Sequence, residues 1–249
     1  SATLKTLTLG GVSGTQTLSN SANNLTISSA GSINSNGVLY FGGGTLSGTN
    51  TVTGVLNWTG GKISGALTVA SNAVLHLSGA ATKTADTVVL TNWGTTTWTN
   101  AGWFALRYTT FYNQPGALLD IQDNPGYLQN NNSGVFTNAG LVRKSAGLGT
   151  TIIQVPFYNT GTVSALSGTL QFEGGFYLFP SSVLQFFIGG EMPGSQFGQI
   201  AMSGVVQLGG NLNISLTNGF VPNVGGSFRI LNWGSRKGGF SAASGFDLG

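Results

Sequence analysis

A short phrase that recurs at a nearly constant spacing is the feature that most constrains the fold of this chain. Residues 136–142 read FTNAGLV and residues 157–163 read FYNTGTV, so the pattern aromatic-x-Asn-x-Gly-x-Val returns after 21 residues. A looser copy, WTNAGWF, occupies residues 98–104. Such a period is the signature of a repeat architecture, in which stacked units share one core. The phrase predicts a coil of β-strands with a corner at each Asn-x-Gly.

Asn and Gly suit such corners for separate reasons. Gly adopts positive φ without a steric penalty, and Asn tolerates the left-handed region better than most residues. When coils stack in register, equivalent Asn side chains lie about 4.8 Å apart, close enough for their amides to hydrogen-bond along the stack. The alternative is that these are ordinary turn residues of an antiparallel sandwich or barrel. The expected structural ladder comprises Asn100, Gly102, Asn138, Gly140, Asn159 and Gly161.

The remaining sequence favours an all-β chain. Short runs such as LTI at 25–27 and LTV at 67–69 are separated by Gly, Asn and Ser clusters, and no segment has helical periodicity. Hydrophobic residues make up 40% of the 249 residues and charged residues 6%, too apolar a composition for a disordered chain. We therefore expect a right-handed parallel β-helix (β-solenoid) of about 11–12 coils, roughly 55 Å long.

The character of the sequence changes near residue 176. Residues 176–180 (FYLFP) and 184–188 (LQFFI) are denser in aromatic side chains than the preceding repeats. We expect β-helix repeats over residues 1–175 and wider, more aromatic coils over residues 176–249 that continue the first part. A separate β-sandwich over residues 176–249 is the alternative. Because a terminal coil exposes unpaired N–H and C=O groups, we expect a fragment of a longer protein or a unit that stacks on another copy.

Charge and cysteine content argue against several kinds of partner. The net charge of +3 comes from nine Lys and Arg and six Asp and Glu. These residues are spread along the chain and do not form the basic patch that a nucleic-acid-binding surface requires. Cysteine is absent, so disulfides and Cys-based metal sites are excluded. No apolar run approaches the roughly 18 residues that a membrane span requires. We expect neither a nucleic-acid partner nor a membrane span in this chain.

Several phrases together resemble a known class of repeat. LNWTGGKISG at 56–65, the phrases that begin at Phe136 and Phe157, and SGTL at 167–170 are similar to the repeats of large secreted bacterial β-helix proteins. Such proteins include autotransporter passengers and surface adhesins. The resemblance covers most of residues 40–175 and fades between Trp103 and Gly134. It implies a secreted or cell-surface bacterial protein whose repeats build stalks, matrix or contact surfaces, and it supplies no catalytic residues.

The ionisable residues give little support to an enzyme. Parallel β-helices include polysaccharide lyases and hydrolases, which need clustered carboxylates. Asp120 and Asp123 are close in sequence, but a strand would place them on opposite faces, and DNPG at 123–126 predicts a solvated turn. His76 is the single histidine and is expected to face solvent, so a catalytic triad or a His-based zinc site lacks its other members. We expect no enzyme, no cofactor and no metal site.

An aromatic cluster between residues 93 and 112 is the better candidate for binding. Flat aromatic faces flanked by Asn, Gln and Thr bind sugar rings, although the same rings can fill the core of the coils instead. The residues predicted to contact a glycan are Trp93, Trp98, Trp103, Tyr108 and Tyr112.

Three functional hypotheses follow in order. The first is an extracellular structural or adhesive module that assembles end to end into a filament, or forms the stalk of a larger surface protein. The second is a carbohydrate-binding module that uses residues 93–112. The third is a β-helix polysaccharide lyase or hydrolase. The expected partners are another copy of the chain and a polysaccharide or cell surface.

Overall fold

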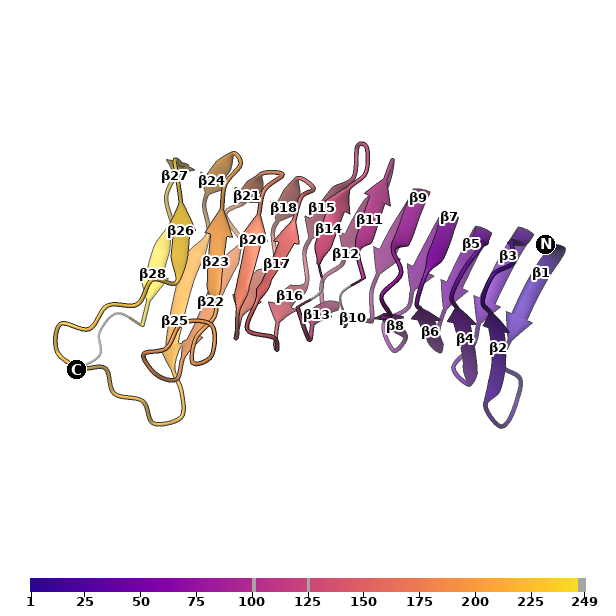
Figure 1. The fold of residues 1–249 in the computed structure, drawn as a ribbon, viewed down its shortest axis with the longest axis horizontal. Coiled ribbons are helices and arrows are strands. Elements are labelled where there is room, and N and C mark those ends of the chain that lie inside the picture. Colours follow the sequence, from indigo (N-terminus) through magenta and orange to yellow (C-terminus); the bar gives the residue numbers. More distant parts are fainter. Residues whose placement is uncertain (100–101, 125, 246–249) are drawn as a thin grey trace.

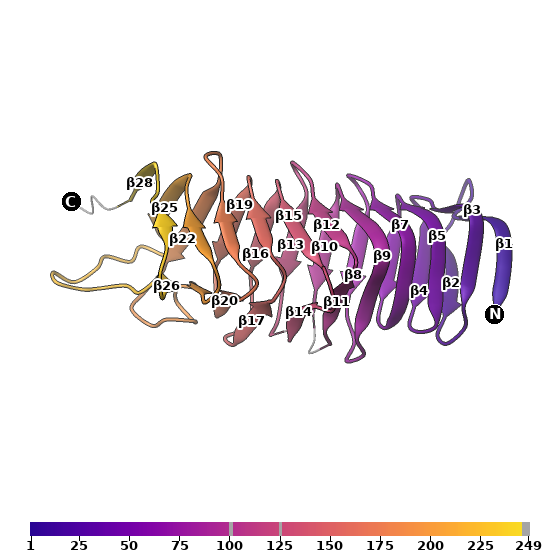
Figure 2. The same ribbon diagram turned by 90° about the horizontal axis from the view of Figure 1, so that it is seen from above.

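The computed structural model describes residues 1–99, 102–124 and 126–245, and it shows a rod of stacked parallel β-strands (Figure 1). Within these ranges there is no helix, and hence none with the length and apolar character to cross a membrane. The strands belong to two sheets of 17 and 11 strands, here called sheet A and sheet B. The chain passes between the sheets as it winds from one end of the rod to the other (Figure 2). The predicted all-β parallel solenoid is confirmed.

Sheet B receives one short strand from each coil. Inward-facing apolar side chains alternate in these strands with outward-facing ones, as expected for a sheet with one buried face. In order along the rod, the strands are β2 (Gln16–Asn20), β4 (Gly37–Phe41), β6 (Val55–Trp58), β8 (Val74–Leu77), β10 (Thr95–Trp98), β13 (Leu118–Ile121), β16 (Leu141–Lys144), β19 (Thr162–Ala165), β22 (Val183–Ile188), β25 (Asn211–Leu216) and β28 (Ala242–Ser244).

Sheet A is built from long bent strands at the N-terminal end of the rod. These strands are β1 (Ala2–Leu9), β3 (Leu25–Ile33), β5 (Thr45–Val52), β7 (Gly61–Val69) and β9 (Lys83–Asn92). Each passes a bend near its middle, where Gly65 in β7 has φ +95° and lies opposite Gly48 of β5. An added Cβ at Gly65 would lie 2.4 Å from the Gly48 carbonyl oxygen, so the bend requires a residue without a side chain.

From β11 onward each coil contributes two strands to sheet A, because a corner loop replaces the bend. β11 and β12 continue the two halves of β9, so the coil keeps its sides while the bend becomes a loop. These strands are β11 (Phe104–Arg107), β12 (Thr110–Asn113), β14 (Tyr127–Asn130), β15 (Val135–Asn138), β17 (Thr150–Ile153), β18 (Phe157–Asn159), β20 (Thr169–Phe172), β21 (Phe176–Leu178), β23 (Gln199–Met202), β24 (Val206–Leu208), β26 (Leu231–Trp233) and β27 (Lys237–Gly238).

The solenoid has about nine complete turns. Eleven strands stack in sheet B, and the nine between β2 and β28 have a neighbour on both sides. The prediction of 11–12 coils is an overestimate, because it divides the whole chain by 21 residues whereas the last coils are longer, with Val183 paired to Asn211 and Asn211 to Ala242. The period is not constant, because Val38 pairs with Val55 whereas Asn211 pairs with Ala242. Loops of unequal length at the corners account for this drift.

The strand ladders run across residue 175 without a break. β18 pairs with β21, β19 with β22 and β20 with β23, so residues 176–245 stack directly on the preceding coils. Beyond β22 the corners lengthen, and the loops after β22 and β25 project from the rod at its C-terminal end (Figure 1).

The core contains a column of aromatic rings in the second half of the rod. Phe111, Phe136, Phe157 and Phe176 occupy equivalent inward positions of β12, β15, β18 and β21. Phe111 and Phe136 stack with their ring centroids 4.8 Å apart, which is the coil spacing itself. The aromatic residue of the repeated phrase is therefore a core residue, stacked on its equivalents.

The tightness of the coil corners can be tested at Gly161. A Cβ at this position would lie 2.2 Å from the Gly140 carbonyl oxygen of the preceding coil, which is backbone and cannot move aside. We expect Gly161→Ala to lower the free energy of unfolding by about 2–4 kcal/mol, measured by denaturant unfolding. Gly234→Ala is the matched control, since no atom lies within 4 Å of its added Cβ. Equal midpoints for the two variants would contradict the packing described here.

Candidate functional site

Four buried asparagines form a continuous ladder at the corner where sheet A leads into sheet B. Asn92, Asn113, Asn138 and Asn159 end β9, β12, β15 and β18 and lie in register. The Nδ2 group of Asn92 donates to Oδ1 of Asn113 at 2.8 Å, Asn113 donates to Asn138 at 2.7 Å, and Asn138 donates to Asn159 at 2.6 Å. All the side-chain amides therefore point the same way along the rod.

The second N–H of each amide satisfies the backbone of the corner. Asn92 donates to the Leu118 carbonyl oxygen at 3.1 Å, Asn113 to that of Leu141 at 3.1 Å, and Asn138 to that of Thr162 at 3.2 Å. A buried amide is costly unless its donors and acceptors are paired. Asn92, Asn113 and Asn138 thus each bond both to the next Asn and to the corner of the next coil.

The ladder is a polar segment within an otherwise apolar column. Val69 occupies the equivalent position before Asn92, and Leu178 occupies it after Asn159. Asn92 accepts a hydrogen bond from the backbone N–H of Gly94 at 3.2 Å, and Asn159 donates to the Gly161 carbonyl oxygen at 2.9 Å. The backbone thus supplies partners at both ends of the ladder.

The structure brings together only part of the predicted Asn/Gly set. Asn138 and Asn159, with Gly140 and Gly161, share one corner as expected. Gly102 does not, because it lies between β10 of sheet B and β11 of sheet A, whereas Gly140 and Gly161 lie between a sheet A strand and a sheet B strand. Asn100 lies outside the described residues.

Sequence reasoning missed two members of the ladder, Asn92 and Asn113. Asn92 stands in LTNWG at 90–94, which fits the phrase except that Leu replaces the aromatic residue. Asn113 follows Phe111, but its Gly is displaced to position 116. A search for apolar-x-Asn without the aromatic and Gly requirements would have found both.

A different set of donors satisfies the corner that leads from sheet B back to sheet A. Trp58 Nε1 donates to the Gly60 carbonyl oxygen at 3.0 Å, and Trp98 Nε1 donates to that of Gly102 at 3.3 Å. Lys144 lies two coils beyond Trp98 in the same column and donates to the Ala146 carbonyl oxygen at 3.0 Å. The end of a sheet B strand is thus repeatedly occupied by a long side chain with a terminal N–H.

Two lysines are fully buried at this corner. Lys83 donates from Nζ to the carbonyl oxygens of Ser78 and Gly79, both at 2.9 Å, and Lys144 also donates to the Asp123 carbonyl oxygen at 2.5 Å. Burial lowers the pKa of each ammonium group to about 8. Backbone carbonyl oxygens, rather than a carboxylate salt bridge, hold these ammonium groups.

The predicted aromatic binding surface is not one surface. Trp93 lies in the corner after β9, Trp103 in the corner before β11, and Tyr108 in the loop between β11 and β12. These three corners belong to different sides of the coil. Tyr112 faces outward from β12. Residues that are close in sequence are therefore dispersed around the rod.

Trp98 is a correction to that prediction. Its side chain is 1% exposed, and its ring packs edge-on against Phe104 with centroids 6.2 Å apart. It fills the core and is not available to a ligand.

Two carboxylates, Asp86 and Asp120, form ion pairs on the outer faces. Both oxygens of Asp120 accept from Arg143, at 3.0 and 2.9 Å, across neighbouring strands of sheet B. Burial raises the pKa of the Asp120 carboxyl, but hydrogen bonds from Arg143, Gln122 and Ser145 outweigh it and hold this pKa below its usual value. Asp120 is thus a buried, paired carboxylate and not part of a solvated turn, whereas Asp123 is exposed.

The remaining candidates for catalysis lie apart. His76 is half-buried, and its Nδ1 lies 2.7 Å from Thr97 Oγ1. Asp86 pairs with Lys62 at 3.3 Å and with Arg107 at 3.2 Å. In the described ranges, no three His, Cys, Asp or Glu side chains come close enough together to hold a metal ion.

Comparison of the chain with protein-family models, with curated proteins and with solved structures finds no match.

The ladder can be tested by interrupting it at its centre. Asn138→Leu leaves the Nδ2 donor of Asn113 and the Oδ1 acceptor of Asn159 without their partners in a buried column. We expect the free energy of unfolding to fall by about 2–4 kcal/mol, measured by urea unfolding. Thr137→Ala, which removes an outward side chain from the same strand, is the control and should change it by less than about 0.5 kcal/mol. A stable Asn138→Leu protein would show that the ladder contributes little.

The buried lysines predict an unusual dependence of stability on pH. Between pH 8 and 10.5 the unfolded chain keeps protons that the native Lys83 and Lys144 have lost, so the free energy of unfolding rises with pH. Below pH 8 both buried lysines are charged, and the cost of burying them lowers the free energy of unfolding by its full amount. Above pH 8 they lose their protons, and we expect the free energy of unfolding to rise by about 1–3 kcal/mol per lysine. Thermal unfolding at pH 7.5, 9 and 10 should show this rise relative to the Lys83→Met/Lys144→Met protein. Parallel pH profiles for the two proteins would refute it.

Proposed function

We propose that this chain is an extracellular structural or adhesive module of the kind found in secreted bacterial surface proteins, with the rod itself as the functional element. The observation that carries the proposal is the unbroken stacking of the coils: every strand of sheet B from β4 to β25 pairs with a strand on each side. Because each coil is hydrogen-bonded to the next, bending or extending the rod requires breaking backbone ladders.

The buried side chains support the same proposal. The asparagine ladder and the phenylalanine column tie successive coils together through contacts between equivalent residues. Ion pairs on the outside, such as Asp120 with Arg143, also join neighbouring coils rather than residues within one coil. Stiffness along the axis is the property that these contacts have in common.

We further propose that copies associate end to end. Among the described strands, β1 pairs only with β3 and β28 only with β25, so each end coil carries an edge that another parallel strand could continue. An apolar cavity of about 340 Å³ lies in the last coils, lined by residues that include Leu212, Ile214 and Leu216. A second copy would cover this opening and extend the ladders.

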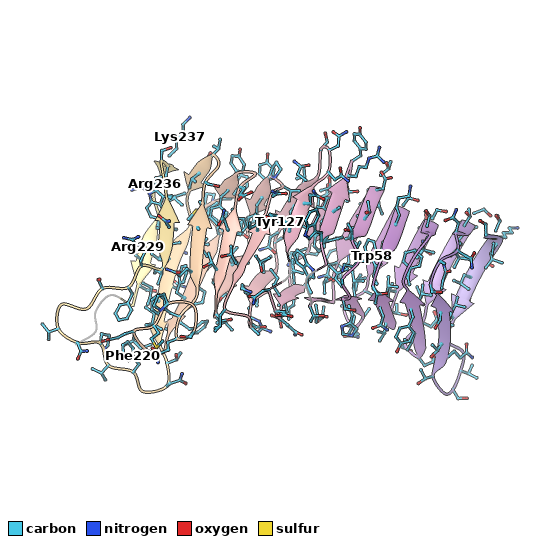
Figure 3. The ribbon with its side chains drawn as sticks, viewed as in Figure 1. Trp58, Tyr127, Phe220, Arg229, Arg236 and Lys237 are labelled. Carbon is cyan, nitrogen blue, oxygen red and sulfur yellow. The ribbon has the colours of Figure 1, made fainter. Side chains whose placement is uncertain are left out.

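The charges at the two ends of the rod predict how end-to-end association depends on salt concentration. Arg229, Arg236 and Lys237 lie at the C-terminal end of the rod (Figure 3), and Lys5 lies in β1 at the other end. Apposed basic ends repel one another, and salt screens this repulsion over about 10 Å at 0.1 M. Association is therefore expected to increase with ionic strength.

No specific observation favours the two other hypotheses, a carbohydrate-binding module that uses residues 93–112 and a polysaccharide lyase or hydrolase. The aromatic side chains between residues 93 and 112 are dispersed over corners, a strand face and the core, so they do not favour glycan binding at that place. Asp120 is engaged by Arg143, so it does not favour a lyase.

Negative-stain electron microscopy of the purified chain at micromolar concentration tests the proposal. We expect separate short rods at low salt and longer fibres of the same width as salt is raised. The Arg236→Gln/Lys237→Gln protein should form fibres at lower salt than the wild type, because the repulsion is smaller. Rods that stay single at every salt concentration would rule out end-to-end assembly, and globular particles would rule out the rod itself.

A further inference from the structure

The outer face of sheet A in the N-terminal half of the rod carries two parallel columns of small, uncharged side chains. They lie on the second halves of the bent strands β1, β3, β5, β7 and β9 (Figure 1), where outward and inward residues alternate. The first column has a hydroxyl group at every coil and consists of Thr8, Ser32, Thr51, Thr68 and Thr91. The second lies two residues earlier on each strand and consists of Thr6, Ala30, Thr49, Ala66, Val89 and Thr110 of β12. We call the two columns the hydroxyl face.

Strand pairing fixes the spacing of the hydroxyl face in two directions. Neighbouring coils are about 4.8 Å apart, and residues two apart on a parallel strand are about 6.6 Å apart. The register shifts between these strands all fall before the columns begin, at Leu4/Thr6, Thr26/Ala30 and Ile63/Gly65. The face is therefore a regular two-dimensional array. Because its members are unequally spaced along the chain, the sequence alone does not reveal it.

The hydroxyl groups of this face are available to bond outward. Thr6, Thr8, Thr49 and Thr51 are exposed. Within the described part of the chain, Ser32 is the only member of the two columns whose side chain hydrogen-bonds to another protein group, with Oγ donating to Asn34 Oδ1 at 2.6 Å. A β-branched threonine has a restricted χ1, so its hydroxyl and methyl groups are positioned before anything binds. Binding to such a face costs little side-chain entropy.

The composition of the hydroxyl face argues against most macromolecular partners. Neither column contains an ionisable residue, so the face does not attract nucleic acid or an anionic membrane. It also lacks Tyr, Trp, Phe, Met and Arg, which anchor protein interfaces, and it has no ring on which a sugar could pack. A hydroxyl group both donates and accepts hydrogen bonds, as a water molecule does. The complementary surface is a rigid lattice of such groups that repeats with the same two spacings.

The array ends at Tyr112. In the first column, Thr91 is followed by Tyr112, Thr137, Tyr158 and Tyr177. Tyr112 is exposed, and the rings of Tyr158 and Tyr177 stack with their centroids 4.8 Å apart. Tyrosine extends farther from the sheet than threonine, so the surface beyond Thr91 is no longer level. One outward column is thus hydroxylated in the first half of the rod and aromatic in the second.

We propose that the hydroxyl face binds ice. Water oxygens of the ice lattice recur along two perpendicular directions at distances close to those between coils and between alternate residues of a strand. Threonine hydroxyls take the places of lattice waters, and the methyl groups fit between them. Many weak contacts made together by a rigid face hold the protein to the crystal. This activity goes beyond the proposed structural role, and a single rod carries the whole face.

The test is growth of ice in solutions of the full chain. Nanolitre osmometry measures the gap between the melting and freezing temperatures of a single crystal. We expect the wild type to facet the crystal, to open this gap and to partition into slowly grown ice. Thr51→Tyr places a projecting ring at the centre of the face and is expected to reduce the gap about fivefold or more at equal concentration. Thr49→Tyr repeats the test in the second column.

Thr137→Tyr is the matched control. Thr137 lies in the first column between Tyr112 and Tyr158, outside the hydroxyl face, so this variant should leave the gap unchanged. Tyrosine already occupies three outward positions of that column, which makes the same substitution compatible with the fold. Unfolding midpoints are compared for all variants. A reduced gap at an unchanged midpoint supports the proposal.

Three results would overturn the proposal. The first is a wild type that neither facets ice nor opens a gap at millimolar concentration, and the second is its exclusion from growing ice. The third is an equal loss of activity in Thr51→Tyr and Thr137→Tyr. Binding to crystalline cellulose or chitin without any effect on ice would also overturn it and assign the face to a polysaccharide surface. Measurements at low salt, where rods are expected to be single, keep these outcomes separate from end-to-end assembly.

Discussion

Backbone hydrogen bonding between successive coils is the constraint on which the rest of this structure depends. Each coil pairs in parallel with the next at a spacing of about 4.8 Å, so a residue at one position is placed directly over its equivalents. Columns of like residues follow. Phe111, Phe136, Phe157 and Phe176 stack in the core, and the asparagines at the adjacent inward position hydrogen-bond along the axis. A side chain in this fold therefore interacts mainly with neighbouring coils, and the contacts that matter are long-range in sequence.

At the corners of the coil, buried backbone groups need hydrogen-bond partners. Side chains of two kinds supply them. At the corner from sheet A to sheet B, neutral Asn amides satisfy both one another and the backbone. At the corner from sheet B to sheet A, Trp58, Trp98, Lys83 and Lys144 donate to carbonyl oxygens. A buried ammonium loses much of its hydration, and the lowered lysine pKa values express that cost. The tryptophans supply a donor without this penalty, but lysine can reach several carbonyl oxygens at once.

Variation in this solenoid is confined to the corners. The strand registers of sheet B are kept while loop lengths change, so the surface is altered without disturbing the core. At the C-terminal end the longer loops after β22 and β25 enclose a groove on a sheet face that is otherwise open. The stacked strands keep the core constant, and the inserted loops change the shape of the surface.

The sequence by itself determined the class of fold and the kind of corner. Alternating short strands, the 21-residue phrase and the Asn-x-Gly turn are local patterns, and they predicted a parallel solenoid and the pairing of Asn138 with Asn159. Only the tertiary structure decided which residues meet, because register depends on corner lengths that local patterns do not reveal. For that reason the ladder includes Asn92 and Asn113, and the Trp98 side chain lies in the core. The pairing of Asp120 with Arg143 likewise arises between coils, where residues 23 apart in sequence become neighbours.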